Sequence, residues 1–588
     1  MTARATAPEL GREIVQCLLD HGIRQVVAAP GSRNAPLLLA LAERSSRAPR
    51  SSDDGANVVL TVRTDERGAA FWALGQAKAS GEPVAVVTTS GTAVGNLLPA
   101  IMEAHHSHVP IMVVSADRPE PALDTGANQT THQTGIFGRF VAAEADISDA
   151  GTPASRRHQI ARLALAARGL SARGGSGDAG PVHLNVRFAA PLVETPGQSP
   201  GQAGVPSVPA GTFQEARGVP AGTFQEAPGV PAGTSGRRVM TRSVTPVELP
   251  SGPRTVVLVG DASPSVGARA LERSVDHPLL AEPSSNAREV HALRLPRLLL
   301  QTGLAEEIER VVVFGHPTLS RPQQALLGRA DVEVIQVGAA DAVPMRTSLV
   351  CDDVVLPPGD PDWSQRWHRA DDRLSARLDD LLADRWCGPS VAQAVLESTR
   401  PDAGVSANLI MGSSSPARDL DIAAVPEGVP PYFWANRGLA GIDGLIATAG
   451  GIASVRGPST LLIGDVSFTH DLPSLLTGPH ERRPDLRIVV ANDHGGSIFH
   501  TLEQGADAHA AHFERVFATP LTLDLEPLAA AVGATFHRVG DLDSLRRVLA
   551  RPIDGLDIID APIPRHDRRE LDAAINALAE DVGRVGPP

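Results

Sequence analysis

Residues 461–499 read LLIGDVSFTHDLPSLLTGPHERRPDLRIVVANDHGGSIF and contain two strand-like runs, each followed by polar residues. The apolar run Leu461-Leu462-Ile463 predicts a buried strand that stops at Gly464-Asp465. The run at 488–491 predicts a second strand, which stops at Asn492-Asp493-His494-Gly495-Gly496. The segment between the two runs is long enough for one crossover connection, so the strands can lie parallel in one sheet.

Parallel strands bring their carboxyl ends to the same edge of a sheet, where open α/β sheets bind ligands. We therefore expect Asp465 to lie near Asn492 and Asp493. Hard oxygen ligands beside glycines that expose their backbone suit Mg²⁺ held against phosphate groups. The alternative interpretation is two ordinary strand ends with turn residues, and this stretch alone does not decide between them.

The composition limits the class of protein. A chain of 588 residues is too long for a single core and predicts about three or four domains. The net charge of −14 argues against a surface for nucleic acid or anionic membrane. The three cysteines are widely spaced and form neither a metal pattern nor a disulfide framework, which is typical of a reducing compartment. No apolar run reaches the length of a membrane span, and residues 1–10, MTARATAPEL, contain no apolar core of a signal peptide, so we expect a cytoplasmic protein.

Strand-like runs alternate with helical periodicity in three segments, which predicts an α/β protein with three consecutive parallel-sheet domains. The predicted domains cover 1–193, 251–385 and 386–588. Between them, residues 194–250 contain the repeated sequence VPAGTFQEA, which begins at Val208 and again at Val219. Its high content of proline and glycine predicts a flexible linker.

Together the motifs resemble those of the thiamine-diphosphate (ThDP) enzymes, whose last domain carries a Gly-Asp…Asn metal motif like that at 464–495. A finer resemblance, to the menaquinone-pathway branch of this family, covers the chain except the repeats. It rests on APGSRN at 29–34, TDER at 64–67, TSGT at 89–92, ADRP at 116–119, GANQ at 126–129, EPSS at 282–285, and NRG…GIDG at 436–444.

The resemblance implies the fold, the reaction and the partners. The three domains become a pyrimidine-binding, a middle and a diphosphate-binding domain. The implied reaction is a decarboxylation of 2-oxoglutarate, followed by 1,4-addition of the succinyl carbanion to isochorismate. The implied cofactors are thiamine diphosphate and Mg²⁺, with Mn²⁺ as a substitute. Because family members place the cofactor between subunits, we expect a homodimer or a homotetramer.

The resemblance also assigns cofactor-binding residues. Glu66 matches the carboxylate that activates the cofactor pyrimidine, and Ile442 matches the apolar wedge beneath the bent cofactor. For the metal it implies Asp465, one of Asn492 and Asp493, and the carbonyl of Gly495. Counting from Asp465 favours Asn492 and counting from Gly495 favours Asp493, and of the two we prefer Asp493. The other matching cofactor positions are Gly412, Ser414, Gly464, Ser467 and Ile498.

The substrates are multiply anionic, and guanidinium groups suit planar, bidentate recognition of carboxylates. Arg418 and Arg437, with Ser414 beside them, match positions that face the succinyl carboxylate. Phe499 continues the apolar wall that begins at Ile498. The positions around the acceptor are Ser32, Arg33, Arg118, Asn128 and Gln129, of which Ser32, Arg33 and Gln129 are also expected to be catalytic. In the middle domain, the arginine that contacts isochorismate could be Arg288, Arg294 or Arg297.

The sequence leaves two other functions to compare with this one. A ThDP carboligase of the acetolactate-synthase type would accept pyruvate and usually carry a flavin, which would colour the protein yellow. The pair Arg418 and Arg437 favours a dicarboxylic donor instead. A scaffold that kept the fold and lost the chemistry would not need Glu66 or Asp465, and a ThDP binding isotherm would identify it.

Overall fold

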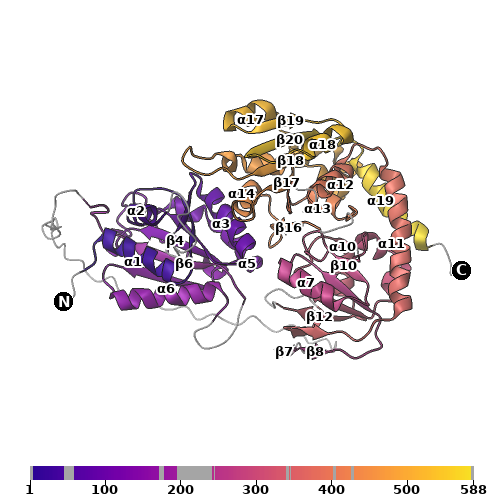
Figure 1. Ribbon diagram of the computed structural model, residues 1–588, viewed down its shortest axis with the longest axis horizontal. Helices are drawn as coiled ribbons and strands as arrows, with labels where there is room; N and C mark the ends of the chain where they lie inside the picture. The colour runs from indigo at the N-terminus through magenta and orange to yellow at the C-terminus, as the bar shows by residue number, and fades with distance from the viewer. Residues whose placement is uncertain are drawn as a thin grey trace.

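The computed structural model describes residues 4–45, 58–170, 178–194, 241–243, 246–289, 291–338, 344, 346–400, 405–425 and 430–583. The predicted repeats lie outside these residues. The described chain forms three six-stranded sheets whose neighbouring strands all run parallel, which confirms the predicted α/β class. Figure 1 shows the three sheets as separate bodies, with the first and the third meeting at helices α3 and α14.

The first sheet has the strand order β2-β1-β3-β4-β6-β5. Helices α1, α2 and α6 cover one face, and α3 and α5 cover the other. Strands β3 and β4 are buried along their whole length, as expected for the centre of a parallel sheet. The elements are α1 (Ala7–Asp20), β1 (Gln25–Ala28), α2 (Ala35–Arg44), β2 (Val59–Val62), α3 (Glu66–Ser80), β3 (Val84–Thr88), α4 (Thr92–Gly95), α5 (Leu98–His106), β4 (Ile111–Asp117), η1 (Glu120–Ala122), η2 (Gly138–Phe140), β5 (Ala143–Ser148), α6 (Pro153–Ala167) and β6 (Val182–Arg187).

The second sheet has the order β10-β9-β11-β12-β13-β7, and β8 pairs with β14 in a small separate sheet. Its core continues onto the long helix α11, where Trp363 and Trp367 are buried. The elements are β7 (Thr241–Ser243), β8 (Val247–Glu248), β9 (Thr255–Val259), α7 (Pro264–Arg273), β10 (Leu279–Ala281), α8 (Pro296–Leu299), α9 (Gly303–Glu306), β11 (Arg310–Phe314), α10 (Arg321–Gly328), β12 (Glu333–Val337), β13 (Thr347–Cys351), β14 (Val354–Val355) and α11 (Pro361–Leu382).

The third sheet has the order β16-β15-β17-β18-β20-β19. The two strands predicted from residues 461–499 are β17 and β18, which are neighbours in register. The elements are α12 (Gly388–Ser398), β15 (Asn408–Met411), α13 (Ser415–Leu420), β16 (Tyr432–Ala435), α14 (Leu445–Arg456), β17 (Ser459–Gly464), α15 (Asp465–His470), η4 (Leu472–Leu475), β18 (Leu486–Asn492), η5 (Ser497–Thr501), η6 (Glu503–Gly505), η7 (Asp507–His509), α16 (Ala510–Phe513), η8 (Glu514–Ala518), α17 (Leu525–Val532), β19 (Thr535–Arg538), α18 (Leu542–Leu549), β20 (Leu556–Pro562) and α19 (Arg568–Gly583).

Two segments differ from the predicted domain boundaries. Strands β7 and β8 lie inside the range predicted as linker, so the middle unit begins before residue 251. Strands of two or three residues at an edge carry too little periodicity to be recognised in a sequence. Helix α19 belongs to the chain's third segment but packs on α11, where Leu571 and Ile575 join the core of the middle unit.

Helices α3 and α14 make the most extensive helix–helix contact of the described chain. Glycines allow this close approach. A Cβ at Gly75 would lie 2.1 Å from the carbonyl oxygen of Thr448, and a Cβ at Gly451 would lie 2.2 Å from that of Trp72. The contact holds helix α3 of the first unit directly against helix α14 of the third.

Candidate active site

Two acids meet at the edge of the third sheet. Asp465 is the first residue of α15, and Asp493 follows β18. The Asp465 carboxyl group accepts hydrogen bonds from the backbone N–H groups of Val466 and Gly495 and also bonds to the Asp493 carboxyl group. Burial raises the pKa of Asp465. Burial and the nearby Asp465 raise the pKa of Asp493 to about 7.

The side chain of Asn492 has different partners from that of Asp493. Its Nδ2 donates to Asp560 Oδ1 on β20 at 2.9 Å, and its Oδ1 accepts the backbone N–H of His494 at 3.2 Å. The side-chain amide therefore holds the strand end together, and the side chain beside Asp465 is that of Asp493. The carbonyl of Gly495 accepts the backbone N–H of Ser497 at 2.9 Å.

Loops after β15 and β17 complete this edge. Ser414 has a φ of 77°, which is strained for a residue with a side chain, and the hydroxyl of Ser413 is buried without a hydrogen-bond partner among the described residues. Ser415 Oγ lies 3.3 Å from Ser497 Oγ, which joins the loops after β15 and β18. A Cβ at Gly464 would meet nothing within 4 Å, so space is open there.

The other predicted cofactor positions are arranged around these loops. The backbone N–H of Gly412 donates to the carbonyl of Leu462 at 2.7 Å, which ties the end of β15 to β17. Ser467 is buried in the first turn of α15, and Ile498 is half-buried in η5. Phe499 contacts Phe517, with ring centroids 5.8 Å apart.

Glu66 begins α3 at the edge of the first sheet. The side chain of Asp65 caps this helix by accepting the backbone N–H groups of Arg67 and Gly68. Asn96 Nδ2 donates to Glu66 Oε2 at 3.2 Å, which orients the half-buried carboxylate.

Arg67 connects this edge to the third unit. It donates to the carbonyl of His470 at 2.9 Å and lies 3.9 Å from Asp443 and 3.8 Å from Asp471. His470 ends the helix that begins with Asp465, and Asp443 follows Ile442. A single chain therefore brings the start of α3 beside the helix of Asp465 and the turn of Ile442.

The predicted acceptor residues of the first unit gather at its strand ends. Arg118 donates to Ser90 Oγ at 2.5 Å and to the carbonyl of Gln129 at 2.7 Å, and Gln129 Nε2 donates to the carbonyl of Ser90 at 2.9 Å. Arg33 donates to the carbonyl of Phe188 at 2.9 Å, and burial, followed by the nearby Arg118, lowers its pKa.

Two further acceptor positions from the sequence, like Gln129, are exposed. Ser32 lies at the surface of the turn that Asn34 holds, because Asn34 Oδ1 accepts the N–H of Gly31 at 2.9 Å. Asn128 is exposed, and its carbonyl accepts the Thr130 hydroxyl at 3.4 Å. These two residues lie on the same sheet edge. Their side chains are held by fewer hydrogen bonds than those of Arg118 and Gln129.

Three arginines meet on the other side of the site. Burial, followed by the nearby Arg437 and Arg297, lowers the pKa of Arg418. Arg437 donates to Thr318 Oγ1 at 2.8 Å, and Arg418 donates to the carbonyl of Ser414 at 3.0 Å. The buried Nε of Arg297 has no hydrogen-bond partner among the described residues.

The other two middle-unit arginines have structural partners. Arg288 is buried and donates to the carbonyls of Leu420, Asp421 and Ala423. Arg294 donates to the carbonyl of Ile422 and pairs with Asp379 at 2.8 Å. Of the three candidates from the sequence, Arg297 is therefore the one that lies with the site arginines.

Sequence reasoning did not single out Asn96, Arg67 or Ser90. Ser90 lies within the TSGT motif at 89–92, so its place at a strand end was available as a signal. Asn96 and Arg67 lie in or beside helices, and only the packing of α3 reveals their partners. In the part of the chain that the structure describes, no three His, Cys, Asp or Glu residues form a metal-binding group, and no helix is both long and apolar enough for a membrane span.

The chain is similar to known proteins over nearly its whole length. Residues 8–136 match the family described as "Thiamine pyrophosphate enzyme, N-terminal TPP binding domain". Relatives named 2-succinyl-5-enolpyruvyl-6-hydroxy-3-cyclohexene-1-carboxylate synthase include proteins from Nocardioides sp. (42% identical, covering 98% of this chain and 100% of that protein), Kineococcus radiotolerans (43%, 94% and 95%) and Rhodococcus jostii (36%, 98% and 99%). The resemblance predicted from the sequence motifs is confirmed, and the chain belongs to the 2-succinyl-5-enolpyruvyl-6-hydroxy-3-cyclohexene-1-carboxylate synthase family of thiamine pyrophosphate enzymes.

Proposed function

We propose that this chain catalyses the ThDP- and Mg²⁺-dependent decarboxylation of 2-oxoglutarate and the 1,4-addition of the succinyl unit to isochorismate, a step of menaquinone biosynthesis. The observation that carries the proposal is the contact between Glu66's helix α3 and the helix that begins at Asp465, where Arg67 donates to the carbonyl of His470, in a chain that matches synthases of this name over nearly its full length. The reaction requires a cofactor site and recognition of two different anions.

The residues at the acidic edge fit a diphosphate held through a divalent cation. The carboxyl groups of Asp465 and Asp493 are buried together and bond to each other, so a cation in place of the shared proton would relieve their repulsion. The open space at Gly464 and the unpartnered hydroxyl of Ser413 suit phosphate oxygens. We assign Mg²⁺, or Mn²⁺, to Asp465, Asp493 and the carbonyl of Gly495, with Asn492 in a structural role.

The remaining cofactor contacts follow from the same loops. Gly412, Ser414, Gly464, Ser467 and Ile498 would line the cofactor, and Ile442 would support its bend. When bound, ThDP supplies the nucleophilic carbon and the electron sink that decarboxylation needs. Glu66 would hold a proton at Oε1 toward the pyrimidine, because Asn96 already donates to Oε2.

The basic residues form two groups that match the two substrates. Burial lowers the pKa of Arg418, and the nearby Arg437 and Arg297 lower it further, so three guanidinium groups lie together in a partly desolvated pocket that suits an anion. We assign the distal carboxylate of 2-oxoglutarate to Arg418 and Arg437, and Arg297 beside them stays the middle-unit candidate for isochorismate. Arg33 and Arg118, on the first unit, would bind the carboxylates of isochorismate, and Ser32, Asn128 and Gln129 would contact its ring substituents.

We also propose that the enzyme acts as a homodimer or a homotetramer. Large apolar side chains are exposed on both units near their junction: Val59 on β2, Tyr432 on β16 and Leu439 in the following loop. A second copy that covers these side chains would remove them from water. Light scattering of the purified chain should therefore give at least twice the mass of one chain, and a monomer would contradict this proposal.

The test of the reaction is CO₂ release from 2-oxoglutarate, measured with and without isochorismate, ThDP and Mg²⁺. We expect turnover only when all four are present and a product with the mass of the succinyl adduct. Turnover of pyruvate by a yellow, flavin-containing protein would favour the acetolactate-synthase type instead. An absence of any 2-oxoglutarate turnover would refute the proposed function.

A further inference from the structure

The chain has 53 lysine and arginine residues. Lys78 is the one lysine, and all the others are arginines. Lys78 therefore carries the one primary amine among the side chains of this chain. The two side chains differ physically: lysine offers a compact charge with three donors on a flexible stem, whereas arginine offers a longer planar fork.

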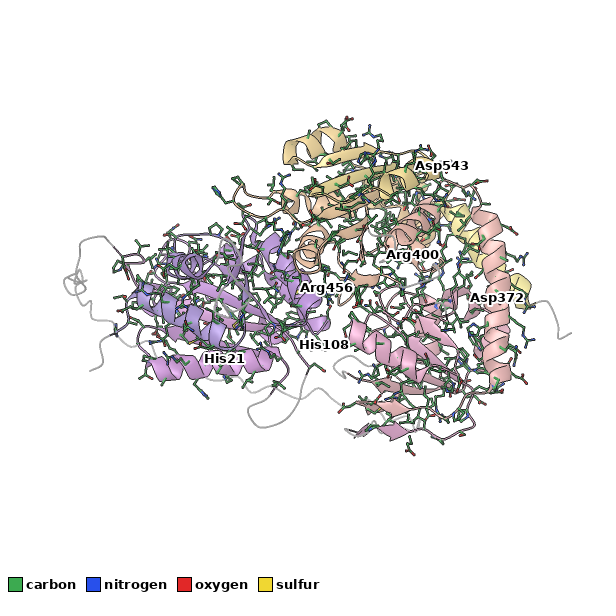
Figure 2. All side chains as sticks on the ribbon, viewed as in Figure 1. His21, His108, Asp372, Arg400, Arg456 and Asp543 are labelled. Atoms are coloured by element: carbon green, nitrogen blue, oxygen red, sulfur yellow. The ribbon has the colours of Figure 1, made fainter. Side chains whose placement is uncertain are left out.

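Lys78 lies where the three units of the chain meet. It is in the last turn of α3, and its side chain is 10% exposed. Its Nζ donates to the carbonyl of Ala435, the last residue of β16, at 2.5 Å. A cavity of about 290 Å³ beside it is lined by residues of all three units, among them His108, Asp261 and Ala435. Figure 2 shows His108 at this junction.

Glu103, on α5 of the first unit, holds the same loop of the third unit. Its Oε1 accepts the backbone N–H of Gly438 at 2.8 Å, and its Oε2 accepts that of Leu439 at 2.7 Å. The side chain is only 4% exposed, and its nearest cation is Lys78, whose Nζ lies 3.8 Å from Oε1. A buried carboxylate needs such a partner, because an unpaired buried charge is strongly destabilising.

The loop that these two residues hold runs from 436 to 443. It contains Arg437, one of the three clustered arginines, and Ile442, the proposed cofactor wedge. Neither Lys78 nor Glu103 has a described contact with the acidic edge at Asp465. Their effect on chemistry would therefore pass through the loop.

We propose that Lys78 and Glu103 form a clamp between the first and third units that positions loop 436–443 for the cofactor and the donor substrate. Both are positioning residues. The inference rests on the proposed function, because it assigns the loop its role in that site.

The geometry of the clamp suits a compact ammonium group. Nζ fits between the Ala435 carbonyl and Glu103, and its charge also reaches the middle unit. Burial raises the pKa of Asp261, and Lys78 is the foremost of the charges that oppose this rise. A guanidinium at position 78 would extend beyond the Ala435 carbonyl and displace either it or Glu103.

The first test measures binding of ThDP with Mg²⁺ by calorimetry, together with the midpoint of thermal unfolding. We expect Lys78→Met, Lys78→Arg and Glu103→Gln each to weaken ThDP binding about tenfold. The double variant Lys78→Met/Glu103→Gln should bind ThDP no more weakly than the single variant that binds it less tightly, because both changes break the same contact. The control is Gln76→Leu. It removes another cross-unit hydrogen bond of α3, from Gln76 to Ser454, away from the loop, and should bind as the wild type does.

Wild-type-like binding by the two Lys78 variants would overturn the clamp. Equal weakening in Gln76→Leu would also overturn it, because the effect would then be general to the interface. A wild type that binds no cofactor would instead refute the proposed function, and the clamp with it.

The second test uses the unaltered chain and so does not depend on how a variant folds. Because Lys78 carries the one side-chain amine, an acylating reagent has two amine targets, Lys78 and the chain's first residue. Peptide mass spectrometry follows both. We expect ThDP with Mg²⁺ to slow acylation of Lys78 at least about fivefold and to leave the terminal amine unchanged, since a tightened loop shields Nζ. Equal rates at Lys78 with and without the cofactor would contradict the clamp.

Discussion

The first and third units have the same strand order but carry different chemistry. Numbered within each unit, both sheets run 2-1-3-4-6-5. After the second strand, the first unit places Glu66 and the third places the loop with Arg437 and Ile442. After the third strand, the first unit has Thr89-Ser90 and the third has Gly464-Asp465.

This comparison shows that the fold supplies an edge and the sequence supplies its function. The helices that follow the second strand in each unit, α3 and α14, are also the pair that pack together. Equivalent helices of one fold thereby pack together. In the proposed function, the first unit contributes Glu66 and the residues for isochorismate, and the third contributes the acidic edge and the residues for 2-oxoglutarate.

The largest effect is expected from Glu66, the carboxylate of the first unit. Glu66→Gln keeps the hydrogen bond from Asn96 but cannot exchange a proton, so we expect kcat to fall about 10³-fold or more. Steady-state CO₂ release measures the effect, and circular dichroism checks the fold. Glu120→Gln, at an exposed position of η1, is the control that should retain activity. Full activity in Glu66→Gln would mean that the carboxylate of the first unit takes no part in the reaction.

The acidic edge of the third unit should respond next. Asp493→Asn removes the charge beside Asp465, and we expect affinity for Mn²⁺ to fall about 100-fold. Asn492→Ala breaks the bond to Asp560 and should lower thermal stability with little change in metal affinity. Electron paramagnetic resonance of free Mn²⁺ compares the two variants. A greater loss of Mn²⁺ affinity in Asn492→Ala than in Asp493→Asn would mean that Asn492, and not Asp493, binds the metal.

Two arginine substitutions should divide the substrates between the units. Arg418→Met removes a guanidinium from the third unit and should raise KM for 2-oxoglutarate about tenfold or more, with KM for isochorismate nearly unchanged. Arg33→Met, in the first unit, should do the opposite. Initial rates with each substrate varied in turn give both constants. The same pattern in both variants would mean that the two basic groups do not serve separate substrates.

The sequence predicted the strands well and the contacts between units poorly. The runs at 461–463 and 488–491 lie within β17 and β18, because central parallel strands are continuously apolar. Residues at strand ends, such as Asp465 and Glu66, could be placed at a sheet edge for the same reason. The roles of Lys78, Glu103 and Asn96 depend on how α3, α5 and α14 pack, and no periodicity within one segment carries that information.

The smallest effect is a pH dependence located in the middle unit. Burial raises the pKa of Glu282 to about 8, with Arg437, Asp421 and Asp261 nearby. Glu282 therefore keeps its proton in the folded state at neutral pH, whereas the unfolded chain loses it near its ordinary pKa. Its contribution to stability is complete below that ordinary value and is lost as the pH rises toward about 8.

Glu282→Gln fixes the neutral form and keeps an acceptor for the N–H groups of Thr318 and Leu319. We expect the difference in melting temperature between this variant and the wild type to rise by a few degrees between about pH 5.5 and about pH 8.5. Differential scanning calorimetry at several pH values measures it. A difference that does not change with pH would mean that Glu282 is already ionised in the folded protein.

The central claim is that the first and third units together form one cofactor site. Titration of ThDP into the wild-type chain with Mg²⁺ present, followed by isothermal calorimetry, tests it most directly. The account predicts saturable binding with one ThDP per chain and no such binding when Mg²⁺ is chelated. An absence of binding, or binding that does not depend on the metal, would contradict it.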